Sequence, residues 1–449
     1  MSPIPFSPQL LLSRTKLLPE SNCYRIAYSG GMDSHVLLHA LCEIRDSLQV
    51  NITAIHIDHG INKLSGEWAK HCNRICTGLG IELVTHRIEN KCPKGESIES
   101  WARCRRYEIF RECMGTGDIL LTAQHLDDQA ETLLLQLLRG AGPKGLSAMP
   151  ELRRFGPGWM ARPLLDVARD GLREYAVMQG LSWIEDDMNE DLSFDRSFIR
   201  HGILPELKER WPNISRVLSR ASAHQAEASE LLDDLSALDL PAFELSVPDA
   251  LSLDGFFDLS EARRRNVIRY WLRKLGMPIP DSSILSHILT DVAGSRYDAS
   301  PCITWQGIEI RRYGNILHAA RKQGNHDSSM AATWDLGIPY HTNLGDLQAV
   351  RGRGPGIKAA AIPDQKLVVG YRQGGESIRP ATGRHHRALK KLMQEQRIPP
   401  WFRDRIPLLY LNKELVAVAG FWIEDRYYAG PDEDAWQITW EGVDKVVFK

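Results

Sequence analysis

Six consecutive residues, Ser29-Gly30-Gly31-Met32-Asp33-Ser34, combine the residue types that bind phosphate groups. The two glycines permit unusual backbone angles and leave room for a phosphate to approach closely. The two serines add hydroxyl donors, and Asp33 offers a carboxylate to a magnesium ion or to an attacking group. No Gly-Lys-Ser/Thr sequence follows, so the segment is not a Walker loop. The segment therefore predicts an anion-binding turn, against the alternative of an ordinary strand–helix turn.

A second group of reactive side chains is acidic. Asp128 and Glu131 are three residues apart near the start of a predicted helix whose apolar residues begin at Leu133, so they lie on one face, where together they can hold an ammonium group. Asp127 is expected to cap that helix. The alternative is that all three acids only complement the helix dipole and a solvated face.

Arg103 and Arg106 form a third candidate, again three residues apart on one helical face. An arginine can bind a carboxylate or a phosphate through two parallel hydrogen bonds. On its own, such a pair more often belongs to a surface helix with solvated arginines.

The elements that must position these side chains alternate along the chain. Apolar runs predict strands at 24–28, 52–57, 81–88 and 118–122, and helical patterns follow Ser34, Gly60, Ser97 and Asp127. This alternation predicts a doubly wound parallel sheet of the α/β class. Ligands bind beyond the carboxyl ends of such strands. The glycine turn, the Asp58-His59 pair and the segment after Thr122 all follow strands at that edge.

Length and composition set outer bounds. The chain has 449 residues, which is too long for one ordinary core and predicts two or three domains. It has no run of 18 apolar residues and no secretory signal pattern, so no membrane association is expected. The eight cysteines include no Cys-x-x-Cys pair, which favours reduced thiols and a cytoplasmic location.

The turn resembles the pyrophosphate loop of ATP α-hydrolases, and further motifs make the resemblance more specific. They occur in one order: His56 to Gly60, Trp101 to Tyr107, Thr122 to Thr132, Arg139 to Leu146, Arg162 to Leu165, Trp183 to Asn189 and Arg196 to Arg200. This series is similar to the tRNA(Ile)-lysidine synthases. That family uses ATP to join free L-lysine to the wobble cytidine of the isoleucine tRNA with a CAU anticodon, and it releases pyrophosphate. Ser197 and Met188 depart from the family pattern.

The resemblance also implies roles for individual residues. Asp128 and Glu131 would hold the α-ammonium group of lysine, and Arg103 or Arg106 would hold its carboxylate, which leaves the ε-amine to reach the base. The turn Ser29 to Ser34 and His59 would bind ATP, and Asp33 would handle Mg²⁺ or take part in catalysis. Arg196 and Arg200 would contact the tRNA. No DNA partner is expected.

The second half of the chain carries the strongest local charge. The segment from Arg379 to Arg405 holds eight basic residues against two acidic ones, although the whole chain has a net charge of −2. This separation is typical of polyanion binding. The segment resembles the C-terminal tRNA-binding domain of the longer lysidine synthases. The predicted tRNA contacts are Arg379, Arg384, His385, Arg387, Lys390, Lys391, Trp401 and Arg403.

We therefore expect a catalytic domain over residues 1–210, a helical substrate- or tRNA-binding domain over 211–320 and a small α+β tRNA-binding domain over 333–449. The middle domain is expected to contain helices at about 211–240 and 263–275, the second with many arginines that face either RNA or solvent. Two other functions stay open. One is a tRNA thiolase of the same loop class, and the other is a non-catalytic tRNA-binding protein.

Overall fold

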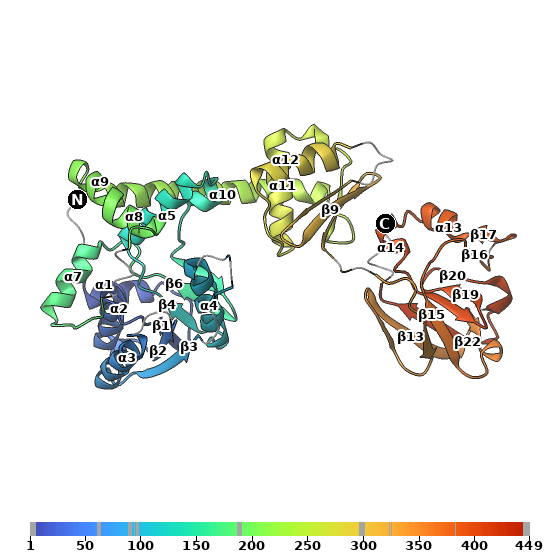
Figure 1. Ribbon diagram of the computed structural model, residues 1–449, viewed down its shortest axis with the longest axis horizontal. Helices are drawn as coiled ribbons and strands as arrows, with labels where there is room; N and C mark the ends of the chain where they lie inside the picture. The colour runs from blue at the N-terminus through green and yellow to red at the C-terminus, as the bar shows by residue number, and fades with distance from the viewer. Residues whose placement is uncertain are drawn as a thin grey trace. The chain divides into compact units, whose positions relative to one another are not determined.

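The computed structural model describes residues 6–442, except 61–63, 89–91, 94, 96–97, 186–190, 296–300, 323, 325 and 382 (Figure 1). Met188 and its neighbours Asp186 to Asn189 therefore lie outside the described residues. The chain forms two compact units, Met1–Leu231 and Leu232–Lys449, and the boundary falls inside helix α10 (Ile214–Asp239). The domain boundaries at 210 and 320 stay predictions.

The first unit contains a six-stranded sheet surrounded by helices. Its strands are β1 (Cys23–Ala27), β2 (Asn51–Asp58), β3 (Glu82–Arg87), β4 (Ile119–Leu121), β5 (Leu152–Phe155) and β6 (Gly158–Ala161). Its helices are α1 (Pro8–Thr15), α2 (Met32–Glu43), α3 (Ser65–Leu79), α4 (Ile98–Glu112), α5 (Leu126–Leu138), α6 (Pro143–Leu146), α7 (Arg169–Met178), α8 (Asp195–Phe198) and α9 (Leu204–Arg210), with the 3-10 turn η1 (Arg45–Ser47) and the π-helix η3 (Ile199–Ile203).

The strand order is β3-β2-β1-β4-β6-β5, and all neighbours are parallel except β5 and β6. The predicted parallel sheet is confirmed, whereas the β5–β6 hairpin was not predicted. The chain runs outward from β1 to β3 and then returns to β4 on the other side of β1. Such a reversal of strand order creates a crevice at the carboxyl ends of the two central strands. The Ser29–Ser34 turn follows β1 and His125 follows β4, so both stand at this crevice.

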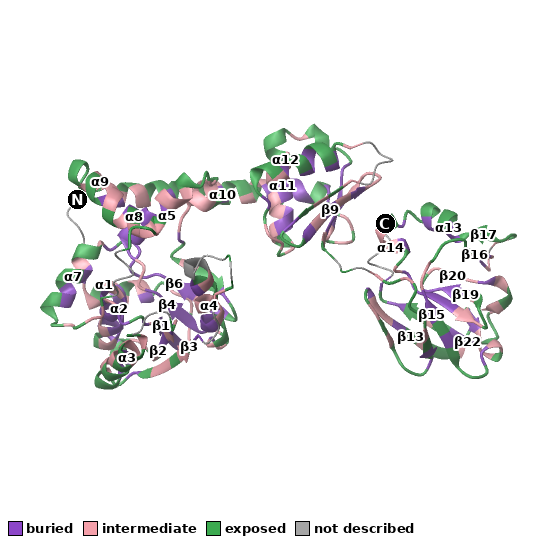
Figure 2. Cartoon of the chain, in the orientation of Figure 1, coloured by how far each residue is buried: buried purple, intermediate pink, exposed green. Residues whose placement is uncertain are grey.

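Two apolar layers hold the sheet. On one face α2 buries Val36, Leu37 and Leu41 against the strands, together with residues of α1, α3 and α7. On the other face α4 contributes Phe110 and the residue Met114 follows it, packed against Leu120 and neighbouring strand residues. Burying this apolar area supplies most of the favourable free energy of folding. Figure 2 shows buried residues concentrated in the strands and the inward helix faces.

The second unit has two separate apolar clusters, one within residues 240–319 and one within 334–440. The first cluster surrounds α11 (Glu261–Lys274), α12 (Ser282–His287) and a four-stranded sheet in the order β7-β10-β9-β8. These strands are β7 (Ala250–Ser252), β8 (Cys302–Trp305), β9 (Ile308–Tyr313) and β10 (Ile316–Arg321). Short helical turns η4 (Leu240–Ala242), η5 (Phe256–Asp258) and η6 (Ile288–Ala293) complete it.

The sheet in this middle region was not expected from the sequence. Its signal is the alternation of buried Ile308, Ile310 and Arg312 along β9, which has the two-residue period of a strand. The predicted α11 is confirmed, but its basic residues face carboxylates within the unit. Arg273 pairs with Asp233, and Lys274 pairs with Glu244. These ion pairs leave less free positive charge for RNA than the sequence indicated.

The C-terminal region consists of two five-stranded sheets and two short helices. The sheet orders are β11-β15-β18-β19-β20 and β12-β13-β22-β14-β21, and β16 and β17 form a separate pair. The strands are β11 (Ala332–Asp335), β12 (Tyr340–Thr342), β13 (Gly345–Arg353), β14 (Gly356–Lys358), β15 (Lys366–Gly370), β16 (Ser377–Ile378), β17 (Arg387–Ala388), β18 (Leu408–Leu411), β19 (Glu414–Val418), β20 (Trp422–Ile423), β21 (Tyr428–Ala429) and β22 (Asp434–Trp440). The helices are α13 (Leu389–Glu395) and α14 (Pro400–Arg403), with turns η7 (Ala359–Ala361) and η8 (Asp425–Tyr427). No helix among the described residues has the length and apolar character needed to cross a membrane.

Candidate active site

The turn between β1 and α2 has the geometry of an anion site. Helix α2 begins at Met32, and its first intrahelical hydrogen bond is donated by His35 to the Gly31 carbonyl. The N–H groups of Met32, Asp33 and Ser34 therefore precede the ladder and point out of the helix N-terminus. The Ser29 and Ser34 hydroxyls lie 3.0 Å apart and tie the two ends of the turn together. The helix dipole and these donors favour a bound phosphate.

Gly30 is required by both its backbone and its surroundings. Its φ is +86°, a conformation that other residues adopt only with strain. A Cβ at this position would lie 2.7 Å from Ile184 Cδ1 and 2.8 Å from Cys72 Sγ. The Ile184 N–H donates to the Gly30 carbonyl at 3.0 Å, so the segment after Trp183 fixes the back of the turn. This contact gives the Trp183–Glu185 part of the motif a structural role.

Asp33 stands at the mouth of the turn with one oxygen available. Its Oδ1 is buried and has no hydrogen-bond partner among the described residues, while Oδ2 lies 3.6 Å from His125 Nε2. No group of three or more His, Cys, Asp or Glu side chains in the described ranges is arranged to hold a metal. Mg²⁺ commonly takes only one or two carboxylates and completes its shell with phosphates and water. A single unpartnered carboxylate oxygen beside a phosphate site therefore fits Mg²⁺.

His125 is a central residue of the site to which the sequence analysis assigned no role. It is almost fully buried, and it, not Asp127, is the N-cap of α5. Its Nδ1 accepts from the Asp128 N–H at 3.4 Å, which places the imidazole proton on Nε2. Nε2 faces Asp128 Oδ2 at 3.4 Å as well as Asp33. Burial lowers the pKa of His125, but Asp128 and Asp33 outweigh burial, and the net pKa is raised. His125 therefore connects the turn to the acidic residues of α5.

Asp128 and Glu131 lie together, as their spacing predicts, but their partners are arginines of this chain. Arg196 donates to Glu131 Oε2 at 2.7 Å and to Asp128 Oδ1 at 2.9 Å. Arg200 donates to Glu131 Oε1 at 2.6 Å and to the same Asp128 oxygen at 2.9 Å. The remaining oxygen, Asp128 Oδ2, accepts from the His125 N–H. Each of the four carboxylate oxygens thus already accepts a hydrogen bond, so an ammonium group has to compete with Arg196 and Arg200 for these carboxylates.

This ion-pair cluster also changes the picture of Arg196 and Arg200, which were predicted to contact tRNA. Their side chains are only 28% and 26% exposed, and both guanidinium groups are directed at Asp128 and Glu131. Burial raises the pKa of Asp128, but His125 and Arg196 outweigh burial, and the net pKa is lowered. Arg200 also lies close enough to Asp33 for that carboxylate to raise its pKa. In this structure the two arginines are engaged with Asp128 and Glu131, and their contact with tRNA stays a prediction.

The Arg103 and Arg106 pair lies on another side of the site. The two residues are on α4, and no contact joins them to Asp128 or Glu131 within the described part of the chain. Arg106 instead lies near His59, the residue that follows β2. Burial first, and Arg106 second, lower the pKa of His59 to about 4. His59 is therefore neutral at pH 7, and its buried Nδ1 has no partner among the described residues. A neutral imidazole with a free nitrogen is suited to a hydrogen bond with a nucleotide.

Asp127 has a structural role. Its Oδ1 accepts from Ser215 of α10 at 2.8 Å and lies 2.5 Å from Lys208 Nζ of α9, while Oδ2 accepts from the Arg169 N–H at 3.1 Å. Burial raises the pKa of Asp127, but Lys208 and Ser215 outweigh it and lower the pKa to about 2. One carboxylate thus joins three helices to the start of the active-site helix.

The predicted tRNA contacts of the C-terminal region divide into two classes. Arg384, His385, Arg387, Lys390 and Lys391 are exposed on and before α13, although Arg387 also pairs with Glu395. Arg379 is engaged with Asp425 at 2.5 Å. Arg403 is buried and donates to the Ile398 carbonyl at 2.8 Å and the Tyr313 hydroxyl at 3.0 Å. Trp401 packs edge-on against His318 with ring centres 5.4 Å apart. Arg403 and Trp401 therefore hold the fold together in this structure, because their polar and aromatic groups are already used.

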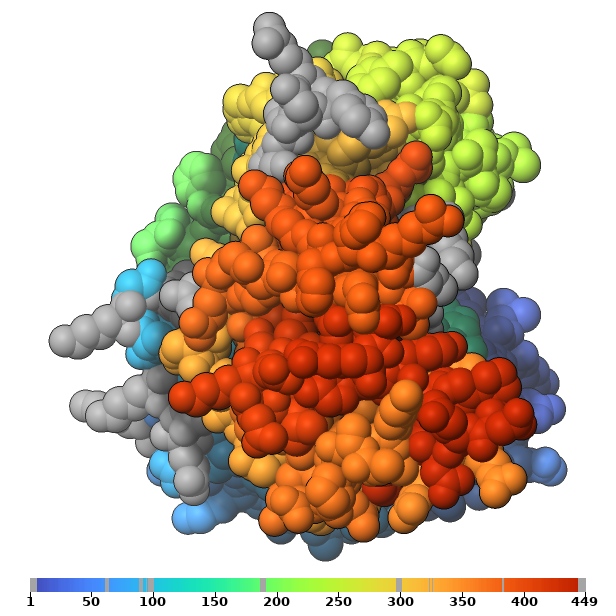
Figure 3. Space-filling view, turned by 90° about the vertical axis from the view of Figure 1, so that its right-hand side faces the viewer, coloured from blue at the N-terminus to red at the C-terminus, as the bar shows by residue number. Residues whose placement is uncertain are grey.

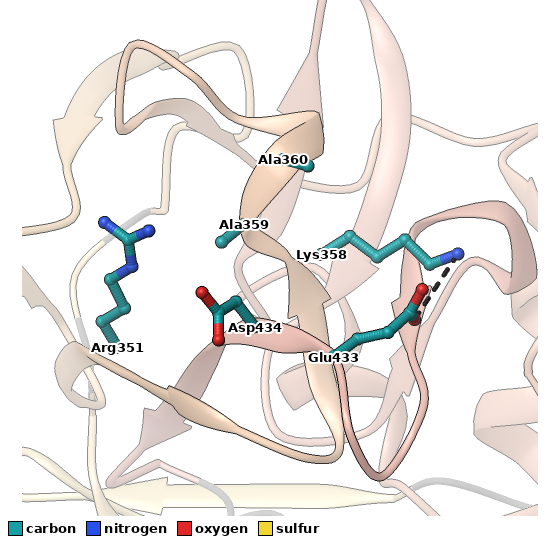
Figure 4. Close-up of a pocket in the computed structure, with 6 residues that line it drawn as sticks. All are labelled: Arg351, Lys358, Ala359, Ala360, Glu433 and Asp434. Carbon is teal, nitrogen blue, oxygen red and sulfur yellow. Dashed lines mark ion pairs between the residues drawn. The ribbon is translucent and has the colours of Figure 1, made fainter.

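The outer surface of the C-terminal region is drawn in orange and red in Figure 3. A hollow of about 330 Å³ on this region is lined by Arg351, Lys358, Ala359, Ala360, Glu433 and Asp434 (Figure 4). Lys358 Nζ lies 3.6 Å from Glu433 Oε2. Two cationic and two acidic side chains balance in this hollow, so it lacks the net positive charge that a polyanion needs. None of the residues predicted from the sequence lines it.

The arrangement at the sheet edge can bind a nucleotide and activate it. The turn and the α2 N-terminus can bind phosphates, and Asp33 can hold Mg²⁺. His125 connects Asp33 and Asp128 electrostatically, because its Nε2 faces both carboxylates. The ion-pair cluster beside them provides both acidic and basic groups for a second, charged substrate. This combination fits transfer of a group activated by ATP.

Comparison with known protein families supports this interpretation in three parts of the chain. Residues 9–207 match the PP-loop domain, residues 251–318 match the TilS substrate binding domain, and residues 367–440 match the TilS substrate C-terminal domain. Among solved structures, a U34-tRNA thiolase from Methanococcus maripaludis aligns at 18% identity with a TM-score of 0.41, over 49% of this chain and 78% of that one. A likeness this distant carries no functional argument.

Curated relatives are much closer. The tRNA(Ile)-lysidine synthase of Coxiella burnetii is 41% identical over 96% of this chain and 96% of its own length. The synthase of Methylococcus capsulatus is 39% identical over 95% of this chain and 98% of its own. The synthase of Yersinia pseudotuberculosis serotype I is 39% identical over 94% of this chain and 95% of its own length. With such identity over nearly the full length of each relative, the chain belongs to the tRNA(Ile)-lysidine synthase family.

Proposed function

We propose that the protein uses ATP to join free L-lysine to the wobble cytidine of the isoleucine tRNA with a CAU anticodon, in the cytoplasm. The observation that carries the proposal is the phosphate-binding turn at the switch point, with the unpartnered Asp33 oxygen next to the His125–Asp128 pair. Such a site suits a reaction in which a nucleotide phosphate becomes bonded to a second substrate. The C-terminal basic surface supplies a place for the tRNA.

The reaction has two balanced steps. The cytidine O2 attacks the α-phosphorus of ATP, and the bond to the β-phosphate oxygen breaks, which releases pyrophosphate. The lysine ε-amine then forms a bond to C2 of the base, the C2–O2 bond breaks, and AMP leaves with that oxygen. The amine has an ordinary pKa near about 10.4, so it must lose a proton before it attacks. Mg²⁺, held by Asp33, would supply charge compensation for the phosphates.

Each group of the site has a proposed part in binding. The turn Ser29 to Ser34 and His59 bind ATP, and Arg103 or Arg106 binds the lysine carboxylate. Asp128 and Glu131 bind the α-ammonium group of lysine after Arg196 or Arg200 has left the cluster. We infer this condition because the oxygens of both carboxylates already accept hydrogen bonds from these arginines. Arg384, His385, Arg387, Lys390 and Lys391 bind tRNA phosphates.

The thiolase alternative is weakened by the environment of two cysteines. Cys72 and Cys76 are buried, and burial raises the pKa of each thiol to about 12. Sulfur transfer requires a thiolate or a cluster-forming set of thiols. These two protonated thiols beneath the turn are suited to packing and not to sulfur chemistry.

The function is tested by incubating the protein with ATP, labelled lysine and separate tRNAs, followed by digestion and nucleoside analysis. We expect label in one modified cytidine, only in the isoleucine tRNA with the CAU anticodon, with one AMP and one pyrophosphate per lysine. Sulfur incorporation would favour the thiolase. Tight tRNA binding without pyrophosphate release would favour a binding protein.

A further inference from the structure

Tyr107 on α4 is surrounded by arginines from three different elements. Its ring packs edge-on against Phe155 with ring centres 5.9 Å apart. The Arg103 guanidinium lies over the ring at 5.1 Å from its centre, and that of Arg153 from β5 lies at 5.6 Å. Arg162, directly after β6, lies close enough to Tyr107 for its positive charge to lower the pKa of the phenol, and its own Nη1 donates to the Pro150 carbonyl at 2.7 Å. Three positive groups thus converge on one phenol.

These arginines lack the counter-charges found elsewhere in the unit. No carboxylate of the described residues lies within ion-pair distance of Arg103, Arg153 or Arg162, whereas Arg196 and Arg200 share two. Arg162 is buried, and its Nε has no hydrogen-bond partner in the ranges that the structure describes. A buried guanidinium without a counter-ion is costly, so this position favours an anionic ligand.

The donors that Arg153 and Arg162 do use are directed in part at a poor acceptor. Arg162 Nη2 lies 3.3 Å from Met160 Sδ, and Arg153 Nη2 lies 3.4 Å from the same sulfur. A thioether is a weak acceptor, and an oxyanion would accept the same hydrogen bonds more strongly. The pKa of Tyr107 also reflects the positive charge of these arginines. Burial raises the pKa of Tyr107, but Arg103 and Arg162 outweigh burial, and the net pKa is lowered.

The cluster lies at the functional edge of the sheet. Arg162 follows the carboxyl end of β6, which pairs in parallel with β4, and β4 pairs in parallel with β1 and its phosphate-binding turn. Arg103 and Arg153 are exposed, so the cluster opens to solvent and does not form a closed pocket. An open cationic site beside an aromatic ring suits one unit of a long polyanion better than a small buried substrate.

We propose that Arg153 and Arg162, with Arg103 across the Tyr107 ring, bind one backbone phosphodiester of the RNA substrate near the nucleotide presented to the turn, which leaves Arg106 for the lysine carboxylate. The proposal rests on RNA being the substrate, and it concerns a different surface from the C-terminal basic residues. The phosphodiester carries one negative charge, which accepts from both guanidinium groups and from the tyrosine hydroxyl.

Two neighbouring residues of β5 provide a matched test. Arg153 and Arg154 are both exposed, and they point to opposite faces of the strand, with Arg154 stacked 3.8 Å from the Trp159 ring centre. Arg153→Ala and Arg154→Ala remove the same charge from almost the same place. Affinity of the full-length protein for tRNA is measured across a salt series. We expect Arg153→Ala to weaken binding about tenfold and to reduce the salt slope by roughly 0.7–0.9, with little effect of Arg154→Ala.

Three results would overturn the proposal. Equal losses for both variants would show that only general surface charge matters. Unchanged tRNA affinity with a raised KM for ATP or for lysine would assign the cluster to a small substrate. The third is spectroscopic: the tyrosinate absorbance that Tyr107→Phe removes should titrate at higher pH when RNA is bound, and an unchanged titration would contradict a phosphate at this position. Because binding and titration need no turnover, a protein that makes no lysidine could still show the site.

Discussion

Asp33, Asp128 and Glu131 are all carboxylates at one sheet edge, yet their partners differ. Asp128 and Glu131 share two arginines, whereas one Asp33 oxygen has no partner among the described residues. A carboxylate that is already saturated contributes to the local fold, and an unsaturated one is available to a ligand. The two kinds of acid should therefore respond differently to substitution.

Asp33→Ala should reduce lysidine formation by at least about a thousandfold. The Mg²⁺ ion that we propose to neutralise the ATP phosphates would lose its carboxylate ligand. The melting temperature should change little, since Oδ1 has no hydrogen-bond partner among the described residues and the contact that Oδ2 loses, with His125 Nε2, is long at 3.6 Å. Single-turnover assays and thermal unfolding check the two parts. Near-normal turnover with normal stability would remove Asp33 from the chemistry.

Glu131→Gln should raise the KM for lysine much more than the KM for ATP, because the proposed ammonium ligand loses its charge at nearly constant volume. The structure adds a second expectation. Arg196 and Arg200 lose half of their counter-charge, so the variant should also unfold more easily. Steady-state kinetics with each substrate varied, beside thermal unfolding, test both. Equal rises in the two KM values would identify the carboxylate as a general structural group.

Residue-level prediction from the sequence succeeded where chemistry is local. The turn at Gly30 and Gly31 and the shared face of Asp128 and Glu131 depend on short spacings, and the structure has both. The pairing of these acids with Arg196 spans 65 residues or more, so spacing could not reveal it. His125 stood inside a quoted motif, but its role depends on the approach of Asp33 from the N-terminus of α2, which is distant in sequence.

At the scale of elements, Asp127 connects helices that are far apart in sequence. Its pKa of about 2 lies below the ordinary 3.8, so the group stabilises the folded state above about pH 4, and this stabilisation is lost as pH falls towards 2. The shift corresponds to about 2 kcal/mol. Asp127→Asn should therefore be less stable than the native protein at pH 7, and the difference should shrink between about pH 4 and pH 2.

Chemical denaturation of both proteins across this pH range measures the difference. Asp234→Asn, at an exposed position of α10, is the control and should show a small difference that does not change with pH. A gap between Asp127→Asn and the native protein that stays constant down to pH 2 would contradict the role of the Lys208 and Ser215 contacts.

The strands and helices of the first unit could be predicted because hydrophobic periodicity marks them clearly. The same holds for α10, which crosses the boundary between the units: its ends agree with those of the helix predicted from 211 to 240 to within three residues. The middle sheet was overlooked because β8, β9 and β10 are short and separated by tight turns at Gly307 and Gly314. The stacking of Trp401 and the burial of Arg403 depend on contacts with Tyr313 and His318, which no local pattern contains.

At the scale of the whole molecule, we expect the chemistry to lie in the first unit, and the basic residues of the C-terminal region to add tRNA affinity beyond the proposed phosphodiester site of the first unit. Replacing Arg384, Arg387, Lys390 and Lys391 by Ala should weaken tRNA binding and reduce the salt slope by up to about three or four. The adenylated intermediate should still form at saturating tRNA. A control variant with the exposed Arg351, Arg353, Lys366 and Lys413 replaced loses the same charge in the same region.

Affinity across a salt series and single-turnover rates at saturation check this separation. An unchanged affinity, or an equal loss in the control variant, would mean that the α13 surface is only solvated positive charge. A complete loss of adenylation at saturating tRNA would mean that this surface also positions the reacting base.

The central claim is that ATP activates the cytidine and that lysine then displaces the activated oxygen. The most direct measurement follows that oxygen. A tRNA whose wobble cytidine carries ¹⁸O at position 2 is allowed to react to completion, and the AMP is analysed by mass spectrometry. The account predicts one ¹⁸O atom in each AMP and none in the modified nucleoside. Unlabelled AMP, or AMP that takes its oxygen from ¹⁸O-carboxyl lysine, would show that ATP activates a different group and would contradict the account.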